Sequence, residues 1–201
     1  MAGSVSAQAT GASSETTAAS PQSAAEAVRA IESTLLEIQS RYVERAEKTK
    51  SFEIDEAGAN QYLRHRARTD LKDGISNPWI RLEKGMAILG ARLDLETLKQ
   101  DMPDNLMLSL LRGVVPVEIE AKLESKDGEG NIRLERVSVS GIELPTSFVE
   151  DLARQHGTAS YLPPGFRLGE SFPLPYDLEA IRLSPRLIRI DQRGSPRQSG
   201  R

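Results

Sequence analysis

Between Val114 and Leu144, apolar and polar residues alternate on both sides of a short glycine-rich stretch. One side of the first arm is apolar and consists of Val115, Val117, Ile119, Ala121 and Leu123. The other side is charged and consists of Glu118, Glu120, Lys122 and Glu124. A period of two residues is typical of a strand with one buried face, and the glycines near Asp127 supply the positive φ angles that a reversal needs. The stretch therefore predicts a β-hairpin with one apolar face.

The second arm of this hairpin contains a shift of phase. Its apolar positions begin at Ile132 and Leu134 and continue at Val137, so Glu135 and Arg136 both lie between consecutive apolar sites. One extra residue in a strand restores the alternation and bends the sheet. We therefore expect a β-bulge near Arg136.

From Ala24 to Lys48 the apolar residues instead recur with the period of a helix. Ser23 and Glu26 have the spacing of a capping box at its start. The stretch predicts a long amphipathic helix that packs its apolar stripe on the sheet. A coiled-coil dimer and a helix lying on a membrane surface are the alternatives.

The remaining elements follow from alternation, caps and turns. They are a strand over Ser51–Glu56, a helix over Glu56–Ala67 with Asp55 as its N-cap, a hairpin over Trp79–Asp94 turning at Lys84-Gly85, a helix over Pro145–His156, and a hairpin over Tyr176–Ile190. In the Trp79–Asp94 hairpin we expect Ile88 to share a layer with Ile80 and Leu82, and Trp79 to lie half-exposed at the sheet margin. The fold class is α+β: a curved antiparallel sheet built from hairpins, a long N-terminal helix and short additional helices.

The two ends of the chain differ in composition from the middle. Residues 1–22 are mostly Ala, Ser, Thr and Gly and predict a disordered leader. Ala7 and Ala9 have the small-x-small spacing of a signal-peptidase site, so the leader is either the remnant of a signal peptide or a chance match in an Ala/Ser tail. Residues 23–191 predict one α+β domain, and residues 192–201 a disordered tail.

The segment Leu95–Gly113 is unusually apolar. Its residues Leu106, Met107, Leu108, Leu110 and Leu111 would occupy nearly the whole circumference of a helix. A surface helix has one apolar stripe, so something other than water must meet the remaining side. The segment is either a helix inside the core or the gate or wall of an apolar ligand groove, for which Leu and Met are suited because they repack around irregular shapes.

Composition and motifs argue against several classes of function. The formal charge of −3 disfavours a dedicated nucleic-acid binder, and the absence of cysteine excludes thiol catalysis and thiolate zinc sites. His65 and His156 are the only histidines and lie far apart in the sequence. The chain contains no P-loop, dinucleotide-binding glycine motif or Gly-x-Ser-x-Gly elbow. We therefore expect a binding protein rather than an enzyme, with no metal and no cofactor.

Four segments resemble a known group of proteins, namely Ile54–Leu63, Val115–Leu123, Ile142–Phe148 and Phe172–Leu183. Through them, Ser51–Ile190 looks like bacterial cell-envelope proteins related to the tubular lipid-binding (TULIP-like) superfamily. The resemblance implies a curved antiparallel sheet wrapped around a long helix, with an apolar groove for acyl chains or other lipids. The chain departs from that pattern because it lacks the N-terminal anchor or signal commonly seen there, and its length suits one lobe at most.

Two functions follow as hypotheses. The first is a lipid-binding or lipid-transfer module of the bacterial envelope, with peripheral membrane contact, located in the periplasm if a signal peptide preceded the chain and in the cytoplasm otherwise. Its groove would be lined by Leu106, Met107, Leu110, Leu111, Val117, Ile119, Phe148 and Leu152. The second is a structural or assembly protein that binds a protein partner through a sheet edge or the first helix. The sequence leaves the lipid and the oligomeric state open.

Overall fold

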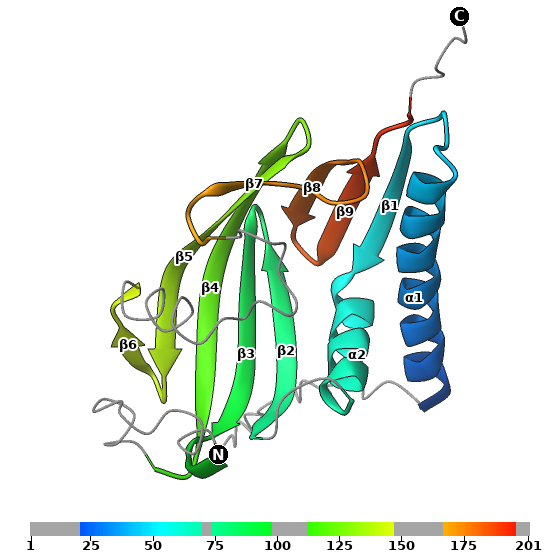
Figure 1. The fold of residues 1–201 in the computed structure, drawn as a ribbon. Coiled ribbons are helices and arrows are strands. Elements are labelled where there is room, and N and C mark those ends of the chain that lie inside the picture. The colour runs from blue at the N-terminus through cyan, green and yellow to red at the C-terminus, as the bar shows by residue number, and fades with distance from the viewer. Residues whose placement is uncertain (1–20, 70–73, 98–111, 147–166, 196–201) are drawn as a thin grey trace, which may run out of the picture.

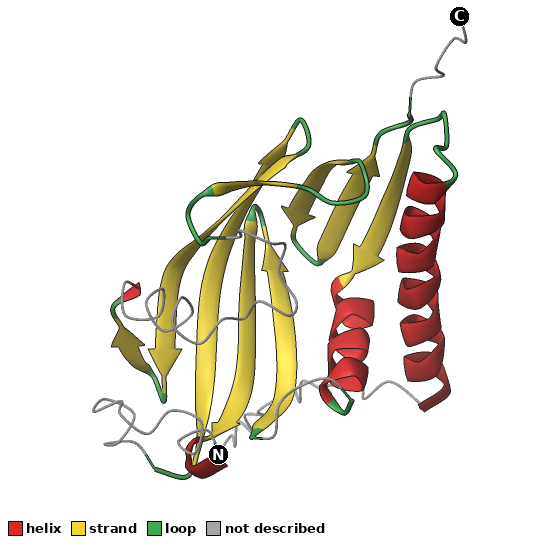
Figure 2. Cartoon of the chain, viewed as in Figure 1, coloured by secondary structure: helices red, strands yellow, loops and turns green. Residues whose placement is uncertain are grey.

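The computed structural model describes residues 21–69, 74–97, 112–146 and 167–195, and these form an α+β fold with two antiparallel sheets (Figures 1 and 2). The helices are α1 (Pro21–Val43) and α2 (Glu56–Ala67). The strands are β1 (Lys50–Asp55), β2 (Ile75–Glu83), β3 (Met86–Asp94), β4 (Val114–Lys126), β5 (Glu129–Val139), β6 (Ile142–Leu144), β7 (Ser171–Pro173), β8 (Leu178–Ser184) and β9 (Leu187–Gln192). Several predicted segments lie wholly or mostly outside these residues. They are residues 1–20 of the predicted leader, the Leu-rich stretch Leu106–Leu111, most of the helix expected over Pro145–His156, and residues 196–201 of the predicted tail.

The large sheet is curved and has the strand order β2-β3-β4-β5-β6, with β7 also paired to β5 (Figure 1). The predicted central hairpin is its middle pair, β4 and β5. Their turn is Asp127-Gly128, and both residues have positive φ, 55° and 87°, as a tight two-residue hairpin turn requires. The predicted bulge is confirmed: Arg136 pairs with Glu120 and Leu134 pairs with Ala121, so Glu135 is the extra residue.

The hairpin of β2 and β3 confirms the turn at Lys84-Gly85 but corrects one side chain. Because this turn places Leu82 opposite Ala87, the next apolar pair is Ile80 with Leu89. Ile88 pairs with Arg81 and therefore lies on the other face of the sheet. The expectation that Ile88 shares a layer with Ile80 is wrong, because a shift of one residue between two arms exchanges the faces.

The small sheet has the strand order β1-β9-β8, and α1 packs on one of its faces (Figure 1). Their shared core consists of Ile38, Phe52, Leu174, Leu178 and Ile190. The buried side chain of Gln192 fixes this contact, because its amide nitrogen donates to the backbone oxygen of Ile38 at 2.9 Å and its oxygen accepts from Nε of Arg41 at 3.0 Å. The hairpin of β8 and β9 is the predicted C-terminal hairpin, with its turn at Pro185-Arg186.

The observed helix α1 differs from the predicted one in its ends and its partner. It ends at Val43 rather than Lys48, and it begins before Ser23, so the expected N-cap at Ser23 is wrong. Val28, Ile31 and Ile38 are its buried apolar residues. The helix lies on the small sheet, and α2 separates it from β2 of the large sheet (Figure 1).

The helix α2 covers the open edge of β2. Its predicted N-cap is confirmed, since Asp55 accepts a hydrogen bond from the backbone nitrogen of Gly58 at 2.6 Å. The side-chain amide of Asn60 pairs with the backbone of Ile80 in both directions, at 2.9 and 2.7 Å. A carboxylate oxygen of Glu56 accepts from the backbone nitrogen of Leu82 at 2.6 Å. These contacts satisfy edge groups that would otherwise be free to pair with another strand.

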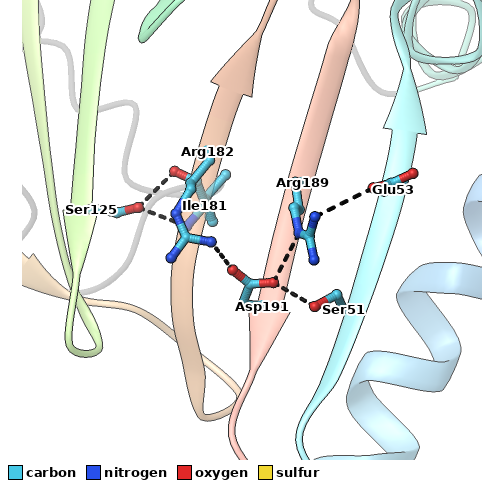
Figure 3. A network of polar contacts seen from close by, with 7 residues as sticks. All are labelled: Ser51, Glu53, Ser125, Ile181, Arg182, Arg189 and Asp191. Atoms are coloured by element: carbon cyan, nitrogen blue, oxygen red, sulfur yellow. Dashed lines mark hydrogen bonds and ion pairs between the residues drawn. The ribbon is translucent and has the colours of Figure 1, made fainter.

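The two sheets meet where the hairpin turns of the large sheet contact the free edge of β8. The hydroxyl of Ser125 donates to the backbone oxygen of Ile181 and accepts from its backbone nitrogen, both at 2.6 Å (Figure 3). In addition, the backbone nitrogen of Gly85 donates to Leu183 at 3.0 Å, and that of Gly128 donates to Glu179 at 2.9 Å. The edge of β8 is therefore paired with turns instead of a strand.

A polar network joins the three strands of the small sheet on the face away from α1 (Figure 3). Its centre is the buried carboxylate of Asp191, which accepts hydrogen bonds from Ser51 at 2.6 Å and from Arg182 and Arg189. The hydrogen bond from Ser51 and the contacts with Arg189 and Arg182 hold the pKa of Asp191 below its ordinary value of 3.8, although burial opposes them. The network fixes the pairing of β1, β9 and β8 from one side.

Candidate functional site

The face of the large sheet that carries Val117 and Ile119 is apolar across its whole width, and we call it the inner face. Residues opposite one another in paired strands point to the same side. Through this pairing, one row runs across five strands and consists of Ile80, Leu89, Ile119, Val137 and Leu144. The next row consists of Ala91, Val117, Val139 and Ile142, and a third of Leu82, Ala87, Ala121 and Leu134. None of these rows contains a charged or polar side chain.

Burial varies across the inner face. Val137 and Val139 are buried, with 3% and 6% of their surface exposed, and Val139 packs with Leu95 and Val115 at one end. By contrast, the predicted site residues Val117 and Ile119 are only half-buried. Ile80, Leu89 and Leu134 are half-buried as well, and Ile142 at the end of its row is 61% exposed. The inner face thus keeps apolar surface that a further apolar group can cover.

The structure therefore brings together two of the eight predicted site residues, Val117 and Ile119, on one strand and one face. The other six, Leu106, Met107, Leu110, Leu111, Phe148 and Leu152, lie outside the described residues. Sequence reasoning missed the neighbours of this pair on the inner face, namely Ile80, Leu89, Leu134 and Leu144. The alternation within each strand shows that these residues share a face of their own strand. Which of them lie side by side depends on the register between strands, and the sequence does not show that register.

The opposite face of the large sheet, which we call the outer face, carries ion pairs. Arg136 donates a hydrogen bond to Glu120 and lies 3.5 Å from Glu118, and Lys122 lies 2.8 Å from Glu124. The hydrogen bond from Arg136 lowers the pKa of Glu120, and the same contact raises the pKa of Arg136. The contrast between the two faces means that an apolar ligand has one side of this sheet available to it.

A smaller hollow of about 300 Å³ lies between α1, β1 and α2. Its walls are mostly small or apolar, with Ala27, Ile31, Ile54 and Ala57 among them. Glu53 and Asp55 add carboxylates at its margin. In this hollow, space remains accessible between α1 and strand β1 of the small sheet.

The described part of the chain offers little support for metal or membrane-spanning sites. Within residues 21–69, 74–97, 112–146 and 167–195, no three His, Cys, Asp or Glu side chains come together in a group that could hold a metal ion. In the same residues, no helix is long and apolar enough to cross a membrane.

Comparison with protein-family models and with curated proteins finds no match.

Proposed function

We propose that this protein is a non-catalytic lipid-binding or lipid-transfer module of the bacterial cell envelope, which holds apolar chains against the inner face of its large sheet. The observation that carries the proposal is the apolar surface that runs from Ile80 on β2 to Leu144 on β6 and is only half-buried at Leu89 and Ile119. The resemblance to tubular lipid-binding proteins supports the same assignment and the envelope location.

The energetics of the proposal rest on the hydrophobic effect alone. Each buried methylene contributes about 0.8 kcal/mol, so a chain of about ten methylenes gains enough to offset the cost of ordering the ligand. The rows of the inner face carry no charge, so they suit an acyl chain and not a headgroup.

The proposal includes the untested residues of the predicted groove. Leu106, Met107, Leu110, Leu111, Phe148 and Leu152 would supply further apolar surface around the chains held at Val117 and Ile119. In the same proposal α1 is a long amphipathic helix that packs on the small sheet and takes no part in the groove, and the protein contacts the membrane only peripherally while it loads or releases lipid.

A quenching experiment tests where the lipid lies. Trp79 is the only tryptophan and points to the outer face, so the wild-type protein is a natural control. In a Trp79→Phe background, Ile119→Trp places an indole on the inner face instead. We expect a brominated fatty acid below its micelle concentration to quench the introduced indole and to leave Trp79 of the wild type unchanged. Equal quenching of both, or of neither, would refute the proposed site, provided that thermal unfolding shows both variants folded.

One observation favours the alternative of a structural or assembly protein. On α1, Leu36 is 62% exposed and Val43 is 76% exposed, and the two are seven residues apart, so they lie on one side of the helix. Such a pair suits a partner helix. Among the sheet edges, that of β2 is less suited to a partner strand because α2 already covers it. Sedimentation of the wild type and of Leu36→Glu tests whether that partner is a second copy of this chain. A wild-type oligomer that Leu36→Glu dissociates would support self-assembly through α1, and a monomer in both would contradict self-assembly.

A further inference from the structure

The only tryptophan of the chain points to the outer face of the large sheet, beside a bulge in β2. Ser76 pairs with Arg92 and Trp79 pairs with Gly90, so two residues of β2, Asn77 and Pro78, lie opposite one residue of β3. Trp79 lies between this bulge and the Lys84-Gly85 turn, so its position opposite Gly90 follows from the register that the turn sets. Asn77 adopts a left-handed conformation with φ of 50°, which asparagine tolerates better than most residues. Bulges are frequent where a strand re-aims a side chain at a site.

The bulge in β5 acts on the same surface. Its extra residue, Glu135, brings Arg136 opposite Glu120 and therefore onto the outer face. Without it Arg136 would pair with Ile119 on the inner face. The bulge in β5 thus brings a guanidinium group to the side of the sheet on which the ring of Trp79 lies.

The indole of Trp79 lies against the backbone of Gly90. A Cβ atom built on Gly90 would come closer than 3.0 Å to three atoms of the ring, so the glycine is what allows the ring to lie there. The guanidinium of Arg81 lies 6.0 Å from the ring centroid. Trp79 as a whole remains half-exposed, so part of the ring is available to a ligand.

A hollow of about 490 Å³ opens beside this ring. Pairing places Trp79, Gly90, Glu118 and Ser138 in one row across four strands, with the carboxylate of Glu118 3.5 Å from the guanidinium of Arg136. Trp79, Arg92, Pro116, Glu118, Arg136 and Ser138 all line the hollow. The side chains of Arg92 and Ser138 have no hydrogen-bond or ion-pair partner in the described part of the chain. The volume lies within the range of about 300 to 1,000 Å³ that is typical of small-molecule sites.

We propose that this hollow is a saccharide-binding site, in which a pyranose ring packs on Trp79 and its hydroxyl groups bond to the surrounding polar side chains. The C–H face of a pyranose is apolar enough to stack on an indole, and its hydroxyls both donate and accept. The Glu118–Arg136 pair offers an acceptor beside a donor, Ser138 offers both, and Arg92 offers donors. This site is on the opposite side of the sheet from the lipid-binding face and does not depend on it.

The same surface disfavours two other ligands. A nucleic acid would stack on the indole, but Arg136 is already paired with Glu118 and Glu120, and Lys122 with Glu124, so these cations are not free to bind a chain of phosphates. An acyl chain would leave the polar walls of the hollow without partners.

The fluorescence emission of Trp79 reports saccharide binding directly, because Trp79 is the only tryptophan and lies in the proposed site. We would titrate the full chain with maltohexaose, xylohexaose, chitohexaose and hexagalacturonate, following the tryptophan emission and the saturation transfer from protein to sugar protons by NMR. We expect at least one of them to shift the emission and to receive saturation at its ring C–H protons. Arg92→Gln and Trp79→Leu should each weaken the binding seen by saturation transfer by about tenfold or more. Arg167→Gln, an exposed arginine outside the hollow that pairs with Glu170, should not.

Several results would overturn the proposal. One is the absence of any response to the four saccharides at tens of millimolar, and another is binding that both Arg92→Gln and Trp79→Leu leave intact. An emission change with adenosine monophosphate but with no saccharide would assign the ring to a base and would also overturn it. If Trp79→Leu fails to fold, Arg92→Gln decides alone, because Arg92 is exposed and its side chain makes no contact on which the described fold depends.

Discussion

At the scale of single residues, Gly90 has a role that only its missing side chain can fill. We predict that Gly90→Ala destabilises the protein by about 1 to 3 kcal/mol, because the new methyl group would overlap the indole of Trp79 and force it or the strand to move. Urea unfolding measures the loss, and a shift of the single tryptophan emission reports the displaced ring.

A double-mutant cycle is the control for Gly90→Ala. In a Trp79→Leu background the same substitution should cost clearly less, because the overlapping ring is gone. An equal cost in both backgrounds would mean that the strand itself, and not the ring, rejects a side chain at position 90.

Asp191 links stability to pH at the same scale. Since its pKa in the folded state lies below the ordinary value of 3.8, its contribution is present at neutral pH and is lost as the pH falls below about 3.8, towards the folded-state pKa. We predict that Asp191→Asn costs about 1 to 3 kcal/mol at pH 7 and much less at pH 2.5. Urea unfolding at both pH values measures this. Asp127→Asn, at an exposed hairpin turn, should show no such difference, and a loss that is independent of pH would contradict the role of the carboxylate.

At the scale of elements, one of the two β-bulges could be predicted from the sequence, and the other bulge and the face of Ile88 could not. The bulge at Glu135 was predictable because the apolar phase on both sides of it lies within one strand. The bulge at Asn77 was missed, because the hairpin was predicted to begin at Trp79 and the bulge lies just before that residue. Ile88 was assigned to the wrong face because alternation defines the two sides of a strand but not which side faces the partner's apolar side.

The contact between α2 and β2 belongs to the same scale. Asn60 acts like a peptide unit at the strand edge, since its amide both donates to and accepts from Ile80. We predict that Asn60→Ala costs about 1 to 3 kcal/mol in urea unfolding, because it leaves two part-buried backbone groups without partners. Asn60→Asp keeps the acceptor but places a carboxylate oxygen against the backbone oxygens of Ile80 and Glu56, so it should cost at least as much as Asn60→Ala. Gln61→Ala, at the next position of α2, is the control. If Gln61→Ala lowers the free energy of unfolding as much as Asn60→Ala does, the loss comes from weakening α2 and not from the lost contact with the edge of β2.

At the scale of the whole molecule, the structure is two sheets joined by turns, with different chemistry on each face of the large one. The packing of α1 on the small sheet could not be predicted, because β1 pairs with β9 near the other end of the chain and no local signal marks such a partner. The inner face was predicted only as far as Val117 and Ile119, since the rows across β2, β3, β5 and β6 exist only in the assembled sheet. The division into an apolar and a polar face is what the proposed lipid-binding function rests on.

Native mass spectrometry, combined with lipid extraction, tests that function most directly. The protein would be purified without detergent from a bacterial host and measured both as isolated and after incubation with mixed liposomes. The proposal predicts a stoichiometric co-purifying lipid or its uptake from liposomes. A clean mass of the protein alone under both conditions would contradict the lipid-binding function and would direct the search to a protein partner at α1.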